Sequence, residues 1–344
     1  MKRSAAQIAE VSVSFAGFGD YAASLKPSLD AFILEQLSYL PGGNGAAPLN
    51  GALRGLTQGK KTRGSLLCLV AAALGAGLEH ALPRAVAVEL IQTATLIHDD
   101  FVDQHRSRRG LPALWTLTGA RRAVLLGDVL FASAIHMMSE LGPEDGRIVS
   151  RAIAEVSRGA LQEPLDAVSL ADEIETGRLN AALYESIIHL KTGVLFGAAC
   201  QLGAVAAHAD LGAQQAWLDY GRRVGEAYQI ADDLHEVRRC LAARTCGLPE
   251  LVAIAPALLF FVQDAGPALL QAARSARATP PGELLEQLGA AAASMNAEID
   301  KRLAAAVAAV EGQLPAGAYS RLAREAPQGV IRMFNDSDPT ASAP

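Results

Sequence analysis

Apolar residues spaced for helices run through this 344-residue chain and limit the folds open to it. They recur every three or four residues in nearly every long segment, which is the spacing of one helix face. Alternating runs of β-branched residues, which strands favour, are almost absent. Several segments are apolar on most faces, as expected of helices buried inside a large bundle. The sequence therefore predicts an all-α fold.

Short stretches rich in glycine and proline separate the expected helices without dividing the chain into halves. They occupy residues 41–48, 141–146, 278–283 and 314–318. Because 51% of the residues are hydrophobic, we expect a single large helical bundle over residues 1–328. The remaining residues, 329–344, end in NDSDPTASAP and offer little to bury, so a disordered tail is expected there.

Charge and cysteine usage exclude several classes of function. The net charge is −6, and no basic run of the kind that binds nucleic acid is present in the sequence. The cysteines are scattered, without the CxxC pair that would predict zinc or a redox dithiol. We interpret them as reduced core thiols of a cytoplasmic protein. They are Cys68, Cys200, Cys240 and Cys246.

The most apolar segments are better interpreted as core helices than as membrane spans. Residues 193–209 approach spanning length but include Gln201, three glycines and a histidine. Residues 251–262 are too short to span a bilayer and contain Pro256. The N-terminal residues lack a long apolar stretch, so we expect no signal peptide and no stable membrane span.

Two apolar segments end in clusters of carboxylates. In residues 93–110, TATLIHDDFVDQHRSRRG, Asp99 and Asp103 are four apart and therefore share one helix face. Like charges so placed destabilise a helix unless a cation compensates, and Mg²⁺ favours one or two carboxylates together with substrate phosphate. Taken alone, this cluster fits a metal site and a solvated helix end equally well.

A second cluster favours the metal site. The segment YQIADDLHEV, residues 228–237, repeats the four-residue spacing at Asp232 and Glu236. Two apolar helices with stacked carboxylates suggest two walls of one cavity that face each other across bound metal ions. The predicted metal ligands are Asp99, Asp100, Asp103, Asp232, Asp233 and Glu236.

Basic residues supply the charges that an anionic substrate needs. The segment QGKKTRG, residues 58–64, places Lys60 and Arg63 three apart, and Arg108 and Arg109 follow the first acidic cluster. Lys191 lies inside an apolar stretch, where a cation is costly unless it meets an anion. Since Lys and Arg suit phosphate oxygens, carboxylates and cations together indicate a site for one or two diphosphates.

At this level of detail the chain resembles the trans-isoprenyl (polyprenyl) diphosphate synthases, from about residue 50 to about residue 240. The likeness rests on five blocks in the family's order: GKKTRG, LIHDDFVDQHRSRRG, GDVLFASA, LKTGVLF and YQIADDLHEV. Gln58, Lys61 and Gly64 depart from the family's first block, and Glu236 replaces the last aspartate of the fifth. The resemblance implies a helical bundle of the isoprenoid synthase type around a central cavity.

The resemblance also implies a role for each matching residue. Mg²⁺ ions that bridge to the allylic diphosphate would be held by Asp99, Asp103 and Asp232. Support, directly or through water, would come from Asp100, Asp233 and Glu236. The allylic diphosphate would contact Arg108, Lys191 and Gln229. Isopentenyl diphosphate would be held by Lys60, Arg63, Gln92 and Arg109. Thr192 would lie beside the reacting carbons.

The implied reaction is Mg²⁺-dependent ionisation, condensation and elimination, which elongates an allylic diphosphate with isopentenyl diphosphate from head to tail. By the same resemblance the protein is expected to form a homodimer. In short-chain members an aromatic ring before the first aspartates acts as a floor for the product. Here Ala94 leaves that space open, so a product of twenty carbons or more is expected.

The chain departs from the family after Glu236, where a GKxxGxD segment with further lysines is usual. Here the sequence reads HEVRRCLAARTCGLPELV, and Lys301 is the only lysine after Lys191. Arginines at 238, 239 and 244 are candidate replacements, although Arg is not a simple substitute for Lys. Two alternatives stay open: a diverged prenyltransferase or cyclase that uses another acceptor, and a non-catalytic partner subunit of a synthase.

Overall fold

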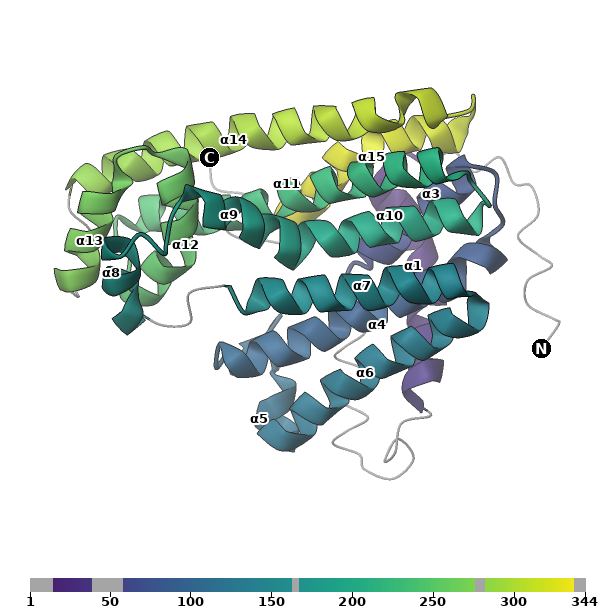
Figure 1. Cartoon of the computed structure of the whole chain (residues 1–344), viewed down its shortest axis with the longest axis horizontal. Coiled ribbons are helices and arrows are strands. Elements are labelled where there is room, and N and C mark those ends of the chain that lie inside the picture. Colours follow the sequence, from purple (N-terminus) through teal and green to yellow (C-terminus); the bar gives the residue numbers. More distant parts are fainter. Residues whose placement is uncertain (1–14, 39–57, 163–166, 276–281, 337–344) are drawn as a thin grey trace. The chain divides into compact units, whose positions relative to one another are not determined.

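The computed structural model describes residues 15–38, 58–162, 167–275 and 282–336, and Figure 1 shows these as helices joined by short connections. The all-α prediction is confirmed. One short hairpin is the exception among the described residues, formed by β1 (Ser107–Arg108) and β2 (Leu111–Pro112). The glycine- and proline-rich stretch at 41–48 lies outside the described residues.

The helices fall into two compact units. Unit 1 comprises residues 1–153, 198–219 and 309–344, and unit 2 comprises residues 154–197 and 220–308. The prediction of one domain over residues 1–328 stays a prediction. Unit 1 holds α1 (Phe18–Ser38), α3 (Thr62–Ala73), α4 (Leu78–Val102), α5 (Leu114–Thr118), α6 (Ala120–Leu141), the 3₁₀ turn η3 (Glu311–Gln313) and α15 (Ala318–Asn335). Unit 2 holds α8 (Ala167–Glu175), α9 (Ala181–Ile187), the π-helix η2 (Ile188–Gly193), α12 (Leu248–Phe261) and α13 (Ala265–Ser275). Residues of both units occur in α7 (Pro143–Ala160), α10 (Val194–Ala206), α11 (Leu211–Ala243) and α14 (Gly282–Val310).

In unit 1, α4 is the central element and packs along both α3 and α6 (Figure 1). Its apolar side chains are buried on several faces, as the sequence predicts for a core helix. Gly127 on α6 permits close contact with α4, because a Cβ there would lie 2.2 Å from the His98 ring. His98 also lies 3.1 Å from the Val124 carbonyl oxygen, which fixes the ring against α6.

In unit 2, α12 packs against α8, α9 and α13. Tyr184 of α9 contacts the rings of Phe260 and Phe261, with centroids 5.3 and 5.7 Å apart. Gly225 of α11 lets the π-helix approach, since a Cβ there would lie 2.9 Å from the Gly193 Cα. These contacts hold the π-helix and the second acidic segment together within one unit.

The C-terminal helix α15 extends past residue 329, where the sequence predicts the start of a disordered tail. We expected a disordered tail over residues 329–344, but α15 continues to Asn335. Val330 and Ile331 are buried there, and they supply the apolar surface that holds this last turn in place. The boundary at residue 329 is therefore too early, and residues 337–344 lie outside the described part of the chain.

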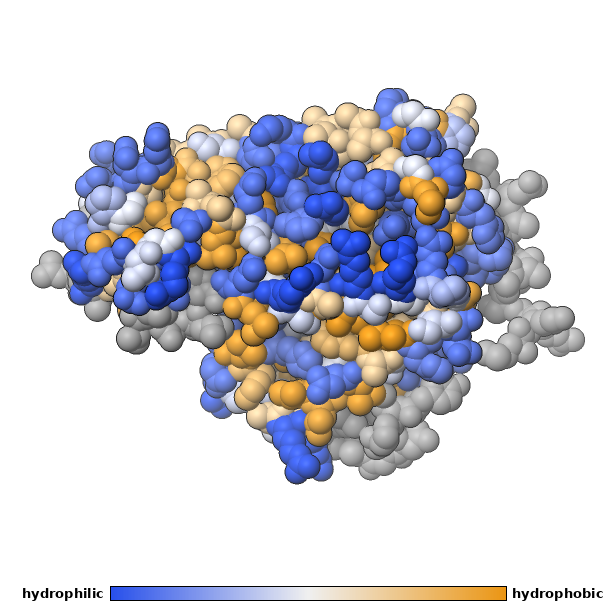
Figure 2. All heavy atoms as spheres, in the orientation of Figure 1, coloured by the Kyte–Doolittle hydropathy of each residue, from blue (hydrophilic) through white to orange (hydrophobic). Residues whose placement is uncertain are grey.

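Two helical segments of the described chain are long and apolar enough to cross a membrane by length and composition. In Ala181–Ala206, 78% of the most apolar stretch is buried inside the protein, as in an ordinary core helix. In α6 only 22% of that stretch is buried. Figure 2 shows apolar side chains gathered on the surface over α5 and α6. These features are weak evidence for a membrane span, because core helices satisfy the same criterion.

Candidate functional site

The first acidic cluster lies at the C-terminal end of α4. Asp99 and Asp100 belong to its last turn, and Asp103 caps the helix with its N–H bonded to the Asp99 carbonyl oxygen at 2.8 Å. A helix C-terminus carries partial negative charge, so carboxylates placed there are unfavourable without nearby cations. The carboxylates at the end of α4 are therefore expected to lie near cations.

One of these carboxylates already has a protein cation. Arg108 Nε donates to Asp100 Oδ1 at 2.7 Å, and Asp100 is buried. Arg108 reaches it from the hairpin, whose two-residue turn places Arg109 and Gly110 at positive φ, as hairpin turns of this length require. Asp100 is therefore held by Arg108, whereas Asp103 is exposed.

The hairpin also brings Arg109 to the basic segment at the start of α3. Arg109 Nη1 donates to the carbonyl oxygen of Gln58. Burial lowers the pKa of Lys60, and the charge of Arg109 lowers it further, against the charge of Asp336, which raises it. Arg63 lies in the first turn of α3. Three of the predicted isopentenyl diphosphate ligands thus gather near one helix N-terminus, a position that favours anions.

Neighbouring Lys61 has a different surrounding from Lys60. It is 4% exposed, adopts a left-handed conformation before α3, and lies 3.6 Å from Asp30. The Gly64 N–H that follows donates to buried Glu89 at 2.8 Å. The structure therefore assigns Lys61 to the packing of unit 1. Gln92, the remaining predicted ligand, is half-buried on α4 two turns before Asp99.

In unit 2, a chain of hydrogen bonds links the second acidic cluster to the Lys-Thr segment. Thr192 Oγ1 donates to Gln229 Oε1 at 2.6 Å, and Gln229 Nε2 donates to Asp233 Oδ1 at 3.1 Å. The Tyr184 hydroxyl donates to the other Asp233 oxygen at 2.6 Å. Three of these four side chains were predicted to be site residues; the fourth, Tyr184, carries no motif signal of its own.

Burial and the neighbouring Asp232 raise the pKa of Asp233 to about 7, against the hydrogen bonds from Tyr184 and Gln229. The charge of Lys191 lowers the same pKa. Lys191, which the sequence predicts to need an anion, therefore acts electrostatically on this carboxylate. Glu236, the last residue of the cluster, pairs with Arg239 at 2.6 Å.

Lys191 and Thr192 belong to the π-helix η2. Such a widened turn within a longer helix is frequent at functional sites, because it re-aims the side chains that it carries. Gly193 and Gly225 leave the room that α11 and η2 need to come together, as a Cβ on Gly225 would lie 2.9 Å from the Thr192 carbonyl oxygen.

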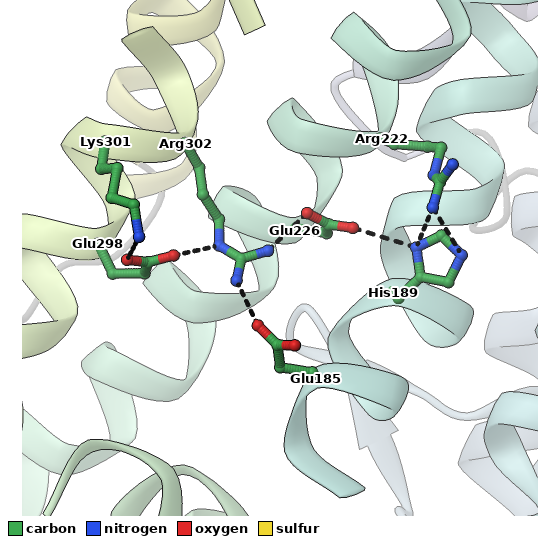
Figure 3. A network of polar contacts seen from close by, with 7 residues as sticks. All are labelled: Glu185, His189, Arg222, Glu226, Glu298, Lys301 and Arg302. Atoms are coloured by element: carbon green, nitrogen blue, oxygen red, sulfur yellow. Dashed lines mark hydrogen bonds and ion pairs between the residues drawn. The ribbon is translucent and has the colours of Figure 1, made fainter. Parts of the chain in front are cut away.

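A network of charged side chains links the π-helix to α9, α11 and α14 (Figure 3). His189 Nδ1 lies 3.0 Å from Glu226 Oε1, and Arg302 Nη1 donates to Glu226 Oε2 at 2.5 Å. Arg302 also reaches Glu185 at 3.2 Å and Glu298 at 2.9 Å. Sequence reasoning missed this network, although a glutamate inside the apolar stretch GEAYQIADD was a usable signal.

The donor set suits a hard divalent cation. Both clusters offer carboxylate oxygens, which Mg²⁺ prefers, and Mg²⁺ completes its coordination with water and substrate phosphate rather than with a protein cage. By the chemistry of their oxygen donors, the carboxylates of the two clusters fit a metal that arrives with a phosphorylated substrate. Within the part of the chain that the structure describes, no three His, Cys, Asp or Glu side chains gather as a complete metal site.

Comparison with known proteins gives a consistent result. The sequence profile of the polyprenyl synthetase family matches residues 48–240. The geranylgeranyl diphosphate synthase of Methanosarcina mazei is 35% identical over 177 residues, which are 51% of this chain and 54% of that protein. Heptaprenyl diphosphate synthase component 2 of Geobacillus stearothermophilus is 36% identical over 53% of this chain and 56% of that protein. The chain thus spans about half the length of these curated relatives.

Solved structures extend the likeness to most of the chain. A polyprenyl synthase from Caulobacter crescentus, complexed with calcium and isoprenyl diphosphate, has a TM-score of 0.71 and 25% sequence identity. The match covers 92% of this chain and 98% of that one. The expected fold of the isoprenoid synthase type is therefore confirmed.

Proposed function

Since this chain belongs to the polyprenyl synthetase family, we propose that it is a trans-prenyltransferase that condenses an allylic diphosphate with isopentenyl diphosphate. The observation that carries this proposal is the arrangement in unit 1. Carboxylates at the end of α4 stand with the cations of the hairpin and of the α3 N-terminus. Carboxylates beside cations are what a metal-bound diphosphate requires.

We propose that Mg²⁺ is bound by Asp99, Asp103 and Asp232, with support from Asp100, Asp233 and Glu236. The carboxylate donors favour this, and the Caulobacter crescentus relative is a complex with calcium and isoprenyl diphosphate. When bound, the metal would stabilise the negative charge that develops on the departing diphosphate. Asp100 pairs with Arg108 and Glu236 pairs with Arg239, which supports a secondary role for these two carboxylates in the proposed metal site.

The chain's own cations would orient the two substrates. Lys60, Arg63 and Arg109, with Gln92, would hold isopentenyl diphosphate, and Arg108, Lys191 and Gln229 would hold the allylic diphosphate. The hydrogen bond from Thr192 to Gln229 couples the residue expected beside the reacting carbons to a diphosphate ligand. Apolar helices would keep water from the allylic cation, and the departed diphosphate would accept the final proton.

We further propose a homodimer in the cytoplasm. The exposed apolar side chains of α5 and α6 provide a surface that a second copy would cover (Figure 2). They include Leu117, Leu125, Val129 and Leu141, each 39% exposed or more. The alternative is assembly with a different subunit. The Geobacillus stearothermophilus relative is named as component 2 of its synthase, which is the reason to test this alternative.

The test is incubation of the purified chain with Mg²⁺, isopentenyl diphosphate and each allylic diphosphate in turn, followed by chromatography of the dephosphorylated products. We expect elongated prenyl alcohols of twenty carbons or more. Elongation only after another subunit is added would support the partner-subunit alternative. Consumption of the allylic substrate without isopentenyl diphosphate would indicate transfer to another acceptor or cyclisation.

A further inference from the structure

The turn between α11 and α12 brings two cysteines together. Cys240 continues the buried face of α11, three residues after Val237 and six after Leu234. The helix ends at Ala243, and Arg244 reverses the chain with φ at 51°. Cys246, two residues later, returns to the same face, so that the two sulfur atoms lie 3.1 Å apart. Both side chains are buried.

Contacts on both sides hold this turn in place. Gly247 precedes α12, and its carbonyl oxygen accepts the Leu251 N–H at 2.9 Å. Arg239 pairs with Glu236 on α11 at 2.6 Å and lies 3.7 Å from Glu250 on α12. The short distance between the sulfurs is thus set by the ends of two helices and by an ion pair between them.

The electrostatic surroundings distinguish this pair from the other two thiols. The hydrogen bond shared by the sulfurs lowers the pKa of Cys240 and raises that of Cys246. Burial raises the pKa of Cys68 to about 12, and burial also raises the pKa of Cys200. Since the thiolate is the reactive form, the pair contains the most readily activated of the four thiols.

We propose that Cys240 and Cys246 form a reversible intramolecular disulfide that fixes the turn between α11 and α12. The oxidant is a low-molecular-weight disulfide such as oxidised glutathione. The Cys240 thiolate attacks one of its sulfurs, which gives a mixed disulfide and releases one thiol. The Cys246 sulfur then attacks Cys240 and releases the second thiol. The protein loses two electrons and two protons, and both protons leave on the two released thiols.

The geometry makes the second step favourable. A disulfide bond is about 2.05 Å long, so the sulfurs need to move about 1 Å closer. This turn lies directly after the second acidic cluster, where the chain departs from the lysine-containing segment usual in the family. The cross-link would fix this turn covalently. It requires neither substrate nor metal and does not depend on the proposed activity.

The experiment is a redox titration of the full chain in buffers of reduced and oxidised glutathione. Samples are quenched in acid, alkylated with N-ethylmaleimide in denaturant and digested with trypsin. Cleavage after Arg239 and Arg244 places the two cysteines on separate peptides, residues 240–244 and 245–274. We expect these peptides to be linked, with a mass two hydrogens below their sum, in oxidising buffers. Reduction with dithiothreitol should separate them.

Cys68 and Cys200 are internal controls and are expected to remain alkylated throughout. A second measurement compares thermal unfolding with and without oxidation. We expect oxidation to raise the Tm of the wild-type chain, because a cross-link restricts the unfolded state, and to leave Cys246→Ser unchanged. If Cys240 and Cys246 are alkylated as fully as Cys68 and Cys200 in the most oxidising buffer, the proposal is wrong. Oxidation of Cys240 to a glutathione adduct without linked peptides would also overturn it.

Discussion

At the scale of single residues, two aspartates offer the sharpest test of the proposed metal sites. We expect Asp99→Ala and Asp232→Ala each to lower kcat by at least about a hundredfold, because each removes a group that stabilises developing charge. Both side chains are polar and incompletely buried, so the helical circular dichroism spectrum should survive. Asp264→Ala, an exposed residue after α12, is the control. Near-normal turnover in either site variant would contradict the proposed metal binding.

Lys60 and Lys191 should separate the two substrates. We expect Lys60→Ala to raise the KM for isopentenyl diphosphate, and Lys191→Ala to affect the allylic substrate and kcat. Loss of one charged hydrogen bond costs about 1.5–3 kcal/mol, or roughly tenfold to over a hundredfold in binding. Steady-state kinetics with each substrate varied would measure this. Equal effects of both changes on both substrates would show that the assignment is mistaken.

Lys61 shows why sequence alone could not finish this assignment. It stands between Lys60 and Arg63 in the printed sequence, and composition cannot distinguish it from its neighbour. The structure buries it against Asp30. The acidic clusters and the basic segments were readable because spacing and residue type carry their chemistry. The Tyr184 partner of Asp233 was not readable, because it stands 49 residues away in a segment that only folding brings near.

At the scale of elements, the predictable part was helix content and the position of the long apolar helices. Periodicity predicts a helix but does not predict where one widens, so the π-helix at Lys191 was missed. The hairpin of Arg108 is too short for strand patterning to reveal. The pairing of Cys240 with Cys246 depends on the reversal at Arg244, which is unusual for arginine.

The charged network beside the π-helix should contribute to stability. Arg302 and Glu226 are only 12% and 13% exposed, so Arg302→Met leaves a largely buried carboxylate with one partner fewer. We expect a loss of about 1.5–3 kcal/mol of unfolding free energy, measured by denaturant titration. A double-mutant cycle with Glu226→Gln isolates the pair. A coupling energy near zero would contradict this role.

The same pair should make stability depend on pH in one direction. Burial of Glu226 by itself raises its pKa, but the hydrogen bond from His189 and the charge of Arg302 outweigh burial and lower it. A lowered folded-state pKa gives stability that is present above the unfolded value, about 4.3, and is lost as pH falls through the folded one. We expect the wild-type advantage over Glu226→Gln to shrink as the pH falls below about 4.3.

Product length is a property of α4. Ala94 is fully buried and Thr95 half-buried, one turn before the aspartates. We expect Ala94→Phe to shorten the main product, because added volume in a packed cavity is not easily absorbed. Thr95→Phe, at a less crowded position, is the second variant if the first fails to fold. Chromatography of dephosphorylated products measures the length. Unchanged length in a folded and active Ala94→Phe would show that the growing chain does not pass this residue.

At the scale of the whole molecule, the exposed apolar side chains of α6 bear on the proposed homodimer. Leu125 and Val129 on α6 are 51% and 39% exposed. Burial of these side chains would remove apolar surface from water, which is favourable, and a monomer does not obtain this free energy. Large exposed apolar patches mark interaction surfaces. A second copy that presents the same helix would bury both patches at once, as symmetric dimers do.

We therefore expect Leu125→Glu, alone or with Val129→Glu, to shift the protein from dimer to monomer, because a buried unpaired carboxylate is costly. Analytical ultracentrifugation over a range of concentrations would measure the shift. Leu211→Glu, which alters a leucine 75% exposed on α11, is the matched control and should leave the dimer intact. If the wild-type chain is monomeric at all concentrations, or if Leu211→Glu dissociates the dimer as much as Leu125→Glu does, α6 is not the interface. A monomer that dimerises only with a different subunit would instead identify the chain as one component of a heteromeric synthase, with the same helix as the surface to test.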